Sequence, residues 1–195
     1  MDRVELKNLA KQQIKGHLGV LFLITLIVYL VSVLVGMIPV VGSLAMALVV
    51  TPAFSIAMVT IYLKLAQNIA PQVNELFAHF SKFWAAFKVT FLTGLFTFLW
   101  SLLFVIPGII KAYSYSMAMY ILAENPEMGA REAIDRSKAM MDGHKMELFV
   151  LELSFIGWYL LCAITFGIAA IWVVPYVSAT ITNFYNSIKN TVNAE

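Results

Sequence analysis

Two long uncharged runs near the start of the chain restrict its fold more than any other feature. Leu18–Ile38 and Leu44–Leu63 contain no Asp, Glu, Lys or Arg. An α-helix rises about 1.5 Å per residue, so about 20 residues cross a hydrocarbon core about 30 Å thick. Lipid offers no hydrogen-bond partners, so the backbone of a spanning segment must pair within itself, as it does in a helix. The two runs therefore predict a transmembrane hairpin that turns at residues 39–43.

A second apolar region extends from Val89 to Ala123 and is interrupted only by Lys111. This region is too long for one straight span but long enough for two short ones. Proline removes a backbone donor and glycine loosens the chain, so Pro107-Gly108 is the expected turn. The alternative is one kinked span followed by an interfacial helix. Two spans are favoured because they also agree with the distribution of charge.

The last apolar region begins at Leu148 and carries only Glu152 as a charged residue before Lys189. It too exceeds the length of one span, and Gly167 is the expected turn. Pro175 is expected to kink the final helix rather than end it, because neighbouring helices in a membrane satisfy the backbone that proline frees. The sequence therefore predicts an all-α bundle of about six spans in three hairpins.

The cations support this topology. Twelve of the 13 Lys and Arg residues would lie on one side of a six-span protein, and Lys111 would lie near the other. Cytoplasmic loops collect Lys and Arg, so we expect a multi-pass protein of the cell membrane with both termini in the cytoplasm. The segments expected on the cytoplasmic side are residues 1–17, 64–88, 124–147 and 189–195.

Composition excludes other classes of protein. The 195-residue chain is 61% hydrophobic and 12% charged, with a mean hydropathy of +0.84. A soluble domain is nearer half apolar and a quarter charged. So small a chain cannot hide this excess in a core, so lipid must be the solvent for one integral membrane domain over residues 1–195. The net charge of +2, without a basic stripe, argues against nucleic-acid binding.

Polar segments on the cytoplasmic side have the periodicity of amphipathic helices. An apolar stripe with a 3.6-residue period runs from Val73 to Phe87, after Pro71. A second helix is predicted over residues 127–142, with Asn125 as its N-cap and Gly143 at its end. Its apolar face is made of small and flexible side chains, and we expect it to pack on protein.

The N-terminal segment has the pattern of a helix that lies in the membrane interface. Its apolar side chains recur every four residues at Leu6, Ala10 and Ile14. Three lysines follow the same spacing beside them and are expected to contact anionic headgroups. These lipid-interface residues are Lys7, Lys11 and Lys15.

The first and last thirds of the chain resemble each other, which predicts a parallel internal repeat. The units cover residues 2–66 and 127–190 and flank a central hairpin at 88–124. In each unit an amphipathic helix ends in Gly-His, and Leu-Phe follows at the same spacing. In the last helix of each unit, Pro, Ser and Tyr recur at matching positions. These matched residues are Pro52, Ser55 and Tyr62 in the first unit, and Pro175, Ser178 and Tyr185 in the second.

The C-terminal half carries the most distinctive motifs: VIPGIIKAYSYSMAMYILAENP, AIDRSKAMMDGHK and LFVLELSFIGWYLLCAITFGI, followed by PY and NFY. With these motifs the chain resembles an uncharacterised family of integral membrane proteins common in Gram-positive bacteria, domain of unknown function nine-seven-five. It is also similar to the membrane portion of some glycerophosphodiester phosphodiesterases, although no hydrolase domain is present. The resemblance implies a bacterial membrane protein and supplies no catalytic residue.

Glu152 is the candidate ligand-binding residue, because it is the one acid inside a predicted span. It lies about 6–9 Å beyond the start of that span, and an ionisable group at depth indicates a functional site. The competing interpretation is structural: the carboxylate reaches the nearby interface, or it pairs with Lys145 or with a serine or threonine between helices.

An enzyme has little support in the sequence. No metal ligands recur at a zinc-binding spacing, and the chain lacks a nucleophile elbow and a phosphate-binding glycine loop. We therefore expect no catalytic residue, metal site or cofactor. The favoured function is a non-catalytic membrane module that binds lipid or a membrane partner, with a homo-oligomer as one form of partnership. The alternative is a small transporter or channel subunit with Glu152 at its polar site.

Overall fold

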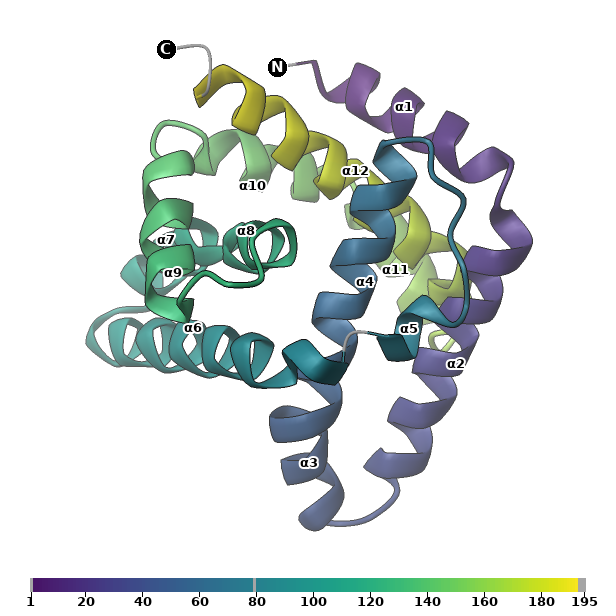
Figure 1. Cartoon of the computed structure of the whole chain (residues 1–195), viewed down its shortest axis with the longest axis horizontal. Coiled ribbons are helices and arrows are strands. Elements are labelled where there is room, and N and C mark those ends of the chain that lie inside the picture. Colours follow the sequence, from purple (N-terminus) through teal and green to yellow (C-terminus); the bar gives the residue numbers. More distant parts are fainter. Residues whose placement is uncertain (1, 79, 193–195) are drawn as a thin grey trace.

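The computed structural model describes residues 2–78 and 80–192, and each regular element in these two ranges is a helix. Both termini lie on the same side of the molecule (Figure 1). The tip of the α2–α3 hairpin lies at the opposite end of the molecule from the start of α1 in the same view. The predicted all-α fold is therefore confirmed.

The first hairpin follows an N-terminal helix, α1 (Arg3–Lys15), and begins with α2 (Leu18–Gly36). The returning arm is one 26-residue helical segment, Val41–Ala66. It consists of α3 (Val41–Ala45), a π-helical turn (Met46–Val50) and α4 (Thr51–Ala66). Pro52 lies directly after the π-helical turn, where a wider turn accommodates the proline ring. The two predicted spans are confirmed, but the turn lies at residues 37–40, because residues 41–43 of the predicted turn already belong to α3.

The second hairpin consists of α6 (Phe83–Leu103), α7 (Val105–Tyr115) and α8 (Ala118–Glu124). The chain reverses at Phe104, which has an extended backbone with φ −157° and ψ 143°. The predicted turn at Pro107-Gly108 is therefore wrong by three to four residues.

The physical reason is that both residues suit the first turn of a helix at this position. Proline lacks an N–H group that the first turn of α7 would leave unpaired in any case. Gly108 is buried against α6, and a Cβ atom there would lie 2.9 Å from both Cα and Cβ of Ser101. Gly108 therefore serves the close approach of two helices rather than a turn.

The third hairpin is preceded by α9 (Ala130–Met140). It consists of α10 (Lys145–Leu153), α11 (Ile156–Ile164) and α12 (Ala170–Val192). The helices α10 and α11 are bent by 43° relative to each other. As predicted, the chain turns at Gly167, which has a φ of +87° that favours glycine, and Pro175 lies inside a continuing helix.

Within the described ranges, four helices are long and apolar enough to cross a membrane: Leu18–Gly36, Val41–Ala66, Phe83–Leu102 and Val105–Glu124. The bent α10–α11 pair brings the number to five. The predicted number of about six was therefore approximate. The remaining long helix, α12, combines an apolar first half with a polar second half, so it falls short of the hydropathy of a span. It nevertheless brings the chain back to the side on which α1 begins (Figure 1). The protein is a multi-pass membrane protein.

Two predicted helix boundaries on the polar side are wrong. The stripe from Val73 to Phe87 is divided among a short helix, α5 (Glu75–Ala78), a 3₁₀ turn (Phe80–Lys82) and the start of α6. An ion pair of 2.6 Å between Glu75 and Lys64 folds this segment back onto α4, so it does not continue as one helix.

Asn125 is likewise not the N-cap of the helix that follows it. It closes α8, because its Nδ2 atom donates a hydrogen bond to the Ile121 carbonyl at 3.1 Å. The following helix, α9, starts at Ala130 instead, with Gly129 at its N-cap. Its predicted end is confirmed, since Gly143 has a φ of +80° just beyond it.

The core lies where the three hairpins meet α1 and α9. The apolar side chains of α1 (Leu6, Ala10 and Ile14) are buried, and α1 packs mainly along α12. The face of α9 formed by Ala130, Ala133, Ile134, Ser137 and Met141 is also buried, against α6, α7, α8 and α12. The prediction that this helix packs on protein is confirmed.

The internal repeat stays a prediction. A short helix, α1 or α9, precedes a helical hairpin in each predicted unit. However, the first arm of one hairpin is the uninterrupted helix α2, whereas the first arm of the other is divided between α10 and α11.

Candidate functional site

Glu152 does not lie alone in the apolar surroundings that its sequence context suggested. The phenol group of Tyr113 on α7 donates a hydrogen bond to Oε2 of Glu152 on α10, with an oxygen–oxygen distance of 2.6 Å. The Phe149 ring meets the Tyr113 ring edge-on, with 6.0 Å between ring centroids. The acid is thus held between two hairpins, where a charge-assisted hydrogen bond stabilises it.

The charged partner expected for Glu152 was Lys145, which pairs with another residue. Lys145 forms an ion pair with Asp142 at 3.1 Å. Lys111 places its ammonium 4.8 Å from the centroid of the Trp100 ring, as a cation–π contact. Sequence reasoning missed Tyr113, which follows Lys111 by two residues and looked like one of many bundle aromatics.

Two of the three predicted lipid-interface lysines contact protein. The Lys7 ammonium donates a hydrogen bond to the Ser154 carbonyl at 3.2 Å and lies 4.1 Å from the Phe155 ring centroid. The Lys11 ammonium lies 5.7 Å from the centroid of the Tyr176 ring. Lys15 is exposed. Contact of these residues with lipid stays a prediction.

The position of Lys7 is informative because Ser154 and Phe155 form the bend between α10 and α11. A bend leaves backbone carbonyl groups without helical partners, and an ammonium group can satisfy one of them. Partial burial and the positive charges of Arg3 and Lys11 lower the pKa of Lys7 from its usual value. Lys7 therefore connects the N-terminal helix to the bend between α10 and α11.

A second polar cluster lies near the end of α12 and was not predicted. Lys189 pairs with both carboxylate oxygens of Glu124, at 2.8 and 2.7 Å. The hydroxyl group of Tyr185 also donates to Glu124, at 2.7 Å, and the Tyr120 ring stacks on the Tyr185 ring with 5.1 Å between centroids. This cluster joins the end of α8 to α12. Its sequence signal was Tyr-x-x-x-Lys, which places both side chains on one helical face.

The Glu124–Lys189 pair forms part of the wall of a cavity of about 590 Å³. Three cations line this cavity, and each comes from a different part of the chain: Lys64 on α4, Arg136 on α9 and Lys189 on α12. The other polar lining residues are Thr60, Gln67, Glu124 and Asn125, and the apolar ones are Leu63 and Ala123. We call this space the basic cavity.

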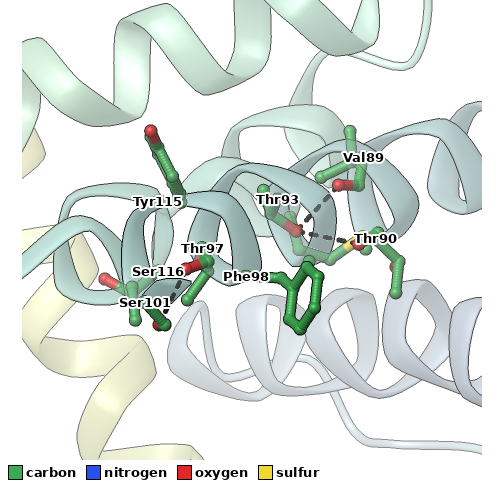
Figure 2. Close-up of a pocket in the computed structure, with 11 residues that line it drawn as sticks. Val89, Thr90, Thr93, Thr97, Phe98, Ser101, Tyr115 and Ser116 are labelled. Carbon is green, nitrogen blue, oxygen red and sulfur yellow. Dashed lines mark hydrogen bonds between the residues drawn. The ribbon is translucent and has the colours of Figure 1, made fainter. Parts of the chain in front are cut away.

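Figure 2 shows another hollow, a groove of about 620 Å³ along α6 that is lined by hydroxyl groups. Each bond drawn there closes onto the hydroxyl group's own helix. Thr93 donates to the Val89 and Thr90 carbonyls at 2.8 and 3.1 Å, and Ser101 donates to the Thr97 carbonyl at 2.8 Å. Such bonds satisfy the hydroxyl groups where lipid offers no partner, and they show no activation for nucleophilic attack.

No group of three or more His, Cys, Asp or Glu side chains that could hold a metal ion occurs in the part of the chain that the structure describes. In the first of the two clusters Glu152 pairs with the Tyr113 hydroxyl group, and in the second Glu124 pairs with Lys189.

The sequence model of one protein family, described as "Protein of unknown function (DUF975)", matches residues 1–114 and 102–192. The chain belongs to this family. Membership confirms the resemblance inferred from the C-terminal motifs, and the DUF975 description assigns no activity. No curated protein and no solved structure matches the chain.

Proposed function

We propose that this DUF975 protein is a non-catalytic membrane module that binds lipid, and that both of its termini lie on the cytoplasmic side of a bacterial cell membrane. The observation that carries the proposal is the basic cavity, which lies at the polar ends of α4 and α8 in a molecule whose spans expose large apolar side chains. A lipid has the same division between a polar head and apolar tails.

The surface of the spans supports this proposal. Large apolar side chains are exposed along α2, α6, α7 and α11, and Leu34, Leu102 and Ile164 are each at least 65% exposed. Monomeric soluble proteins rarely leave so much apolar surface in contact with water. Acyl chains cover such a surface in a bilayer, so a bound lipid can extend its tails along the helices while its head occupies a polar cavity.

Retention of lipid during purification tests the proposal. The protein, extracted in a mild detergent and washed extensively, should keep about one lipid per chain in native mass spectrometry. Addition of lipid should raise its melting temperature, because a ligand that binds only the folded state stabilises it. Loss of all lipid without any change in melting temperature on adding it back would contradict the proposal.

A transporter or channel subunit is the second candidate, and the hydrogen bond between Tyr113 and Glu152 favours it. An ionisable group within membrane helices marks ion and proton pathways in many transporters. Proteoliposomes loaded with a pH-sensitive dye would reveal proton flux. Flux that disappears in Glu152→Gln would support this function, and the absence of flux from wild-type liposomes would exclude proton transport.

The remaining expectations are part of the same proposal. The protein acts without a catalytic residue or cofactor and does not bind nucleic acid. It associates with the bilayer and with a membrane partner or a second copy of itself. The Gram-positive origin and the similarity to the membrane portion of glycerophosphodiester phosphodiesterases also stay proposals.

A further inference from the structure

We infer that the basic cavity is a binding site for a phosphate group, and specifically for the phosphate of a lipid head. This inference rests on the proposed lipid-binding function and gives that function a site and a ligand chemistry. It is argued from the origin of the three cations, their unused hydrogen-bond donors, the charge balance of the lining, and the position of the cavity.

The three cations converge through the fold and not through local sequence. Lys64 is in the last turn of α4, Arg136 is midway along α9, and Lys189 is near the end of α12. Each helix belongs to a different part of the bundle, yet all three side chains line one cavity. Like charges repel, so their convergence is unfavourable unless anionic groups share the space.

Each cation retains donors beyond its known ion pair. An ammonium group has three N–H donors and a guanidinium group has five. Lys64 gives one hydrogen bond to Glu75, at 2.6 Å, and Arg136 gives one from Nη2 to Glu132, at 2.9 Å. The remaining N–H donors can bind a phosphate, because its several oxygen atoms accept charge-assisted hydrogen bonds.

The lining of the cavity carries a positive charge. Its charged members are three cations and one carboxylate, that of Glu124, which gives a net charge of +2 from 3 − 1. The carboxylate groups that pair with Lys64 and Arg136, those of Glu75 and Glu132, are not among the lining residues. Cations therefore outnumber carboxylates among the lining residues, although each cation has one paired carboxylate, and this local excess of cations favours an anion.

A neighbouring cavity has mainly acidic lining residues, so the excess of cations is confined to the basic cavity. It has a volume of about 670 Å³ and shares Gln67, Glu124 and Lys189 with the basic cavity. Its other charged lining residues are the acids Asp2 and Glu5. The Glu124–Lys189 pair thus separates a basic cavity from an acidic one, so a phosphate is directed to one side of the pair.

The position of the basic cavity favours a lipid as the source of the phosphate. Its apolar lining residue Leu63 is the last residue of the uncharged run of the first hairpin, and Lys64 follows directly. The cavity thus lies at the boundary between the apolar span and the polar end of the bundle, which is the depth of phosphate groups in a bilayer. Basic pockets at this depth between membrane helices bind the heads of anionic lipids.

Arg136→Glu tests the inference with little risk to folding, because the side chain is 57% exposed. Arg131→Glu is the matched control: it is exposed, lies on the same helix, changes the charge equally and is not a lining residue. Delipidated protein in detergent would be titrated with phosphatidylglycerol and measured by native mass spectrometry. A parallel titration with inorganic phosphate would follow the melting temperature.

We expect phosphatidylglycerol affinity to fall at least about tenfold in Arg136→Glu and less than about threefold in Arg131→Glu, since a charge-assisted hydrogen bond contributes more than one factor of ten. Competition by inorganic phosphate at millimolar concentration would show that the cavity recognises the phosphate itself. A rise in melting temperature on adding inorganic phosphate, without measurable lipid binding, would retain the phosphate site and overturn its assignment to a lipid.

Two results would overturn the site. Equal losses of affinity in both variants would assign lipid binding to general surface charge, so the proposed function would stand without this cavity. Full wild-type affinity in Arg136→Glu, repeated in Lys189→Gln, would locate the lipid elsewhere on the molecule.

Discussion

The hydroxyl group of Tyr113 donates a hydrogen bond of 2.6 Å to Glu152, and this bond joins α7 of the central hairpin to α10 of the last one. The two residues are 39 positions apart in the chain. Glu152, which is a single acid within an apolar run of the sequence, is therefore paired with a polar side chain in the structure. The contribution of Glu152 to stability can therefore be tested by removing either partner of this hydrogen bond.

Tyr113→Phe should lower the stability of the folded protein by about 1–2 kcal/mol, because it removes the donor to a carboxylate in a poorly hydrated place. Glu152→Gln should lower it by a similar amount, and the double variant should lose less than the sum of the two. Unfolding in detergent, followed by circular dichroism, measures the three values. Tyr159→Phe is the control, and strict additivity would show that the two side chains do not act together.

Gly108→Ala should destabilise the central hairpin by more than about 2 kcal/mol. The new Cβ atom would lie 2.9 Å from two atoms of Ser101, so α7 would have to move away from α6. Gly94→Ala on α6 is the matched control, because a Cβ atom there meets nothing within 4 Å. That change should be neutral or slightly stabilising, as alanine favours helix more than glycine does. Similar melting temperatures for the two variants would contradict this packing.

Ser137→Ala should destabilise the protein by about 1–3 kcal/mol, the cost of unpaired buried polar groups. The Ser137 hydroxyl group is fully buried, donates to the Ser114 carbonyl at 2.9 Å and accepts from the Met117 amide at 3.2 Å. It therefore holds α9 to the junction between α7 and α8. Hydrogen exchange should accelerate at Met117 and its neighbours, whereas the exposed change Ser81→Ala should leave exchange there unaltered.

Lys7→Met should loosen α1 from the rest of the molecule, because it removes the donor to the Ser154 carbonyl and the cation above the Phe155 ring. Lys15→Met is the control, since Lys15 is exposed. Faster hydrogen exchange along α1 in Lys7→Met, with wild-type exchange in Lys15→Met, is the expected result. If both lysines act only on lipid headgroups, as their sequence pattern suggested, the two variants should behave alike and added salt should weaken both contacts equally.

Labelling of single cysteines should establish which side of the membrane each loop faces, in a Cys162→Ser background. Cysteines at Ser43 and Ile168, which are both exposed, should react with an impermeant reagent outside intact cells. Cysteines at Ser81 and Ala139 should react only after the cells are opened. Ser137 and Gly167 are unsuitable sites, since one is buried and the other has a φ of +87°. Reaction of Ser81 and Ala139 from opposite sides would contradict the proposed topology.

The local features of this protein were readable in its sequence. Uncharged runs of sufficient length determine membrane helices, because the backbone in lipid has no other way to satisfy its hydrogen bonds. The turn at Gly167, the end of α9 before Gly143 and the continuation of α12 through Pro175 likewise follow from the conformational limits of these residues. The family was recognisable from the motifs of the C-terminal half.

The tertiary structure decided which polar residues meet. The Pro107-Gly108 sequence suits both a chain reversal and the first turn of a helix. Only the close approach of Ser101 to Gly108 shows that the second is correct. The partner of Glu152 and the convergence of Lys64, Arg136 and Lys189 depend on how the hairpins pack. Sequence periodicity specifies the face of a helix on which a side chain lies, but not the helix that this face meets, because many apolar surfaces in a bundle are nearly equivalent in lipid.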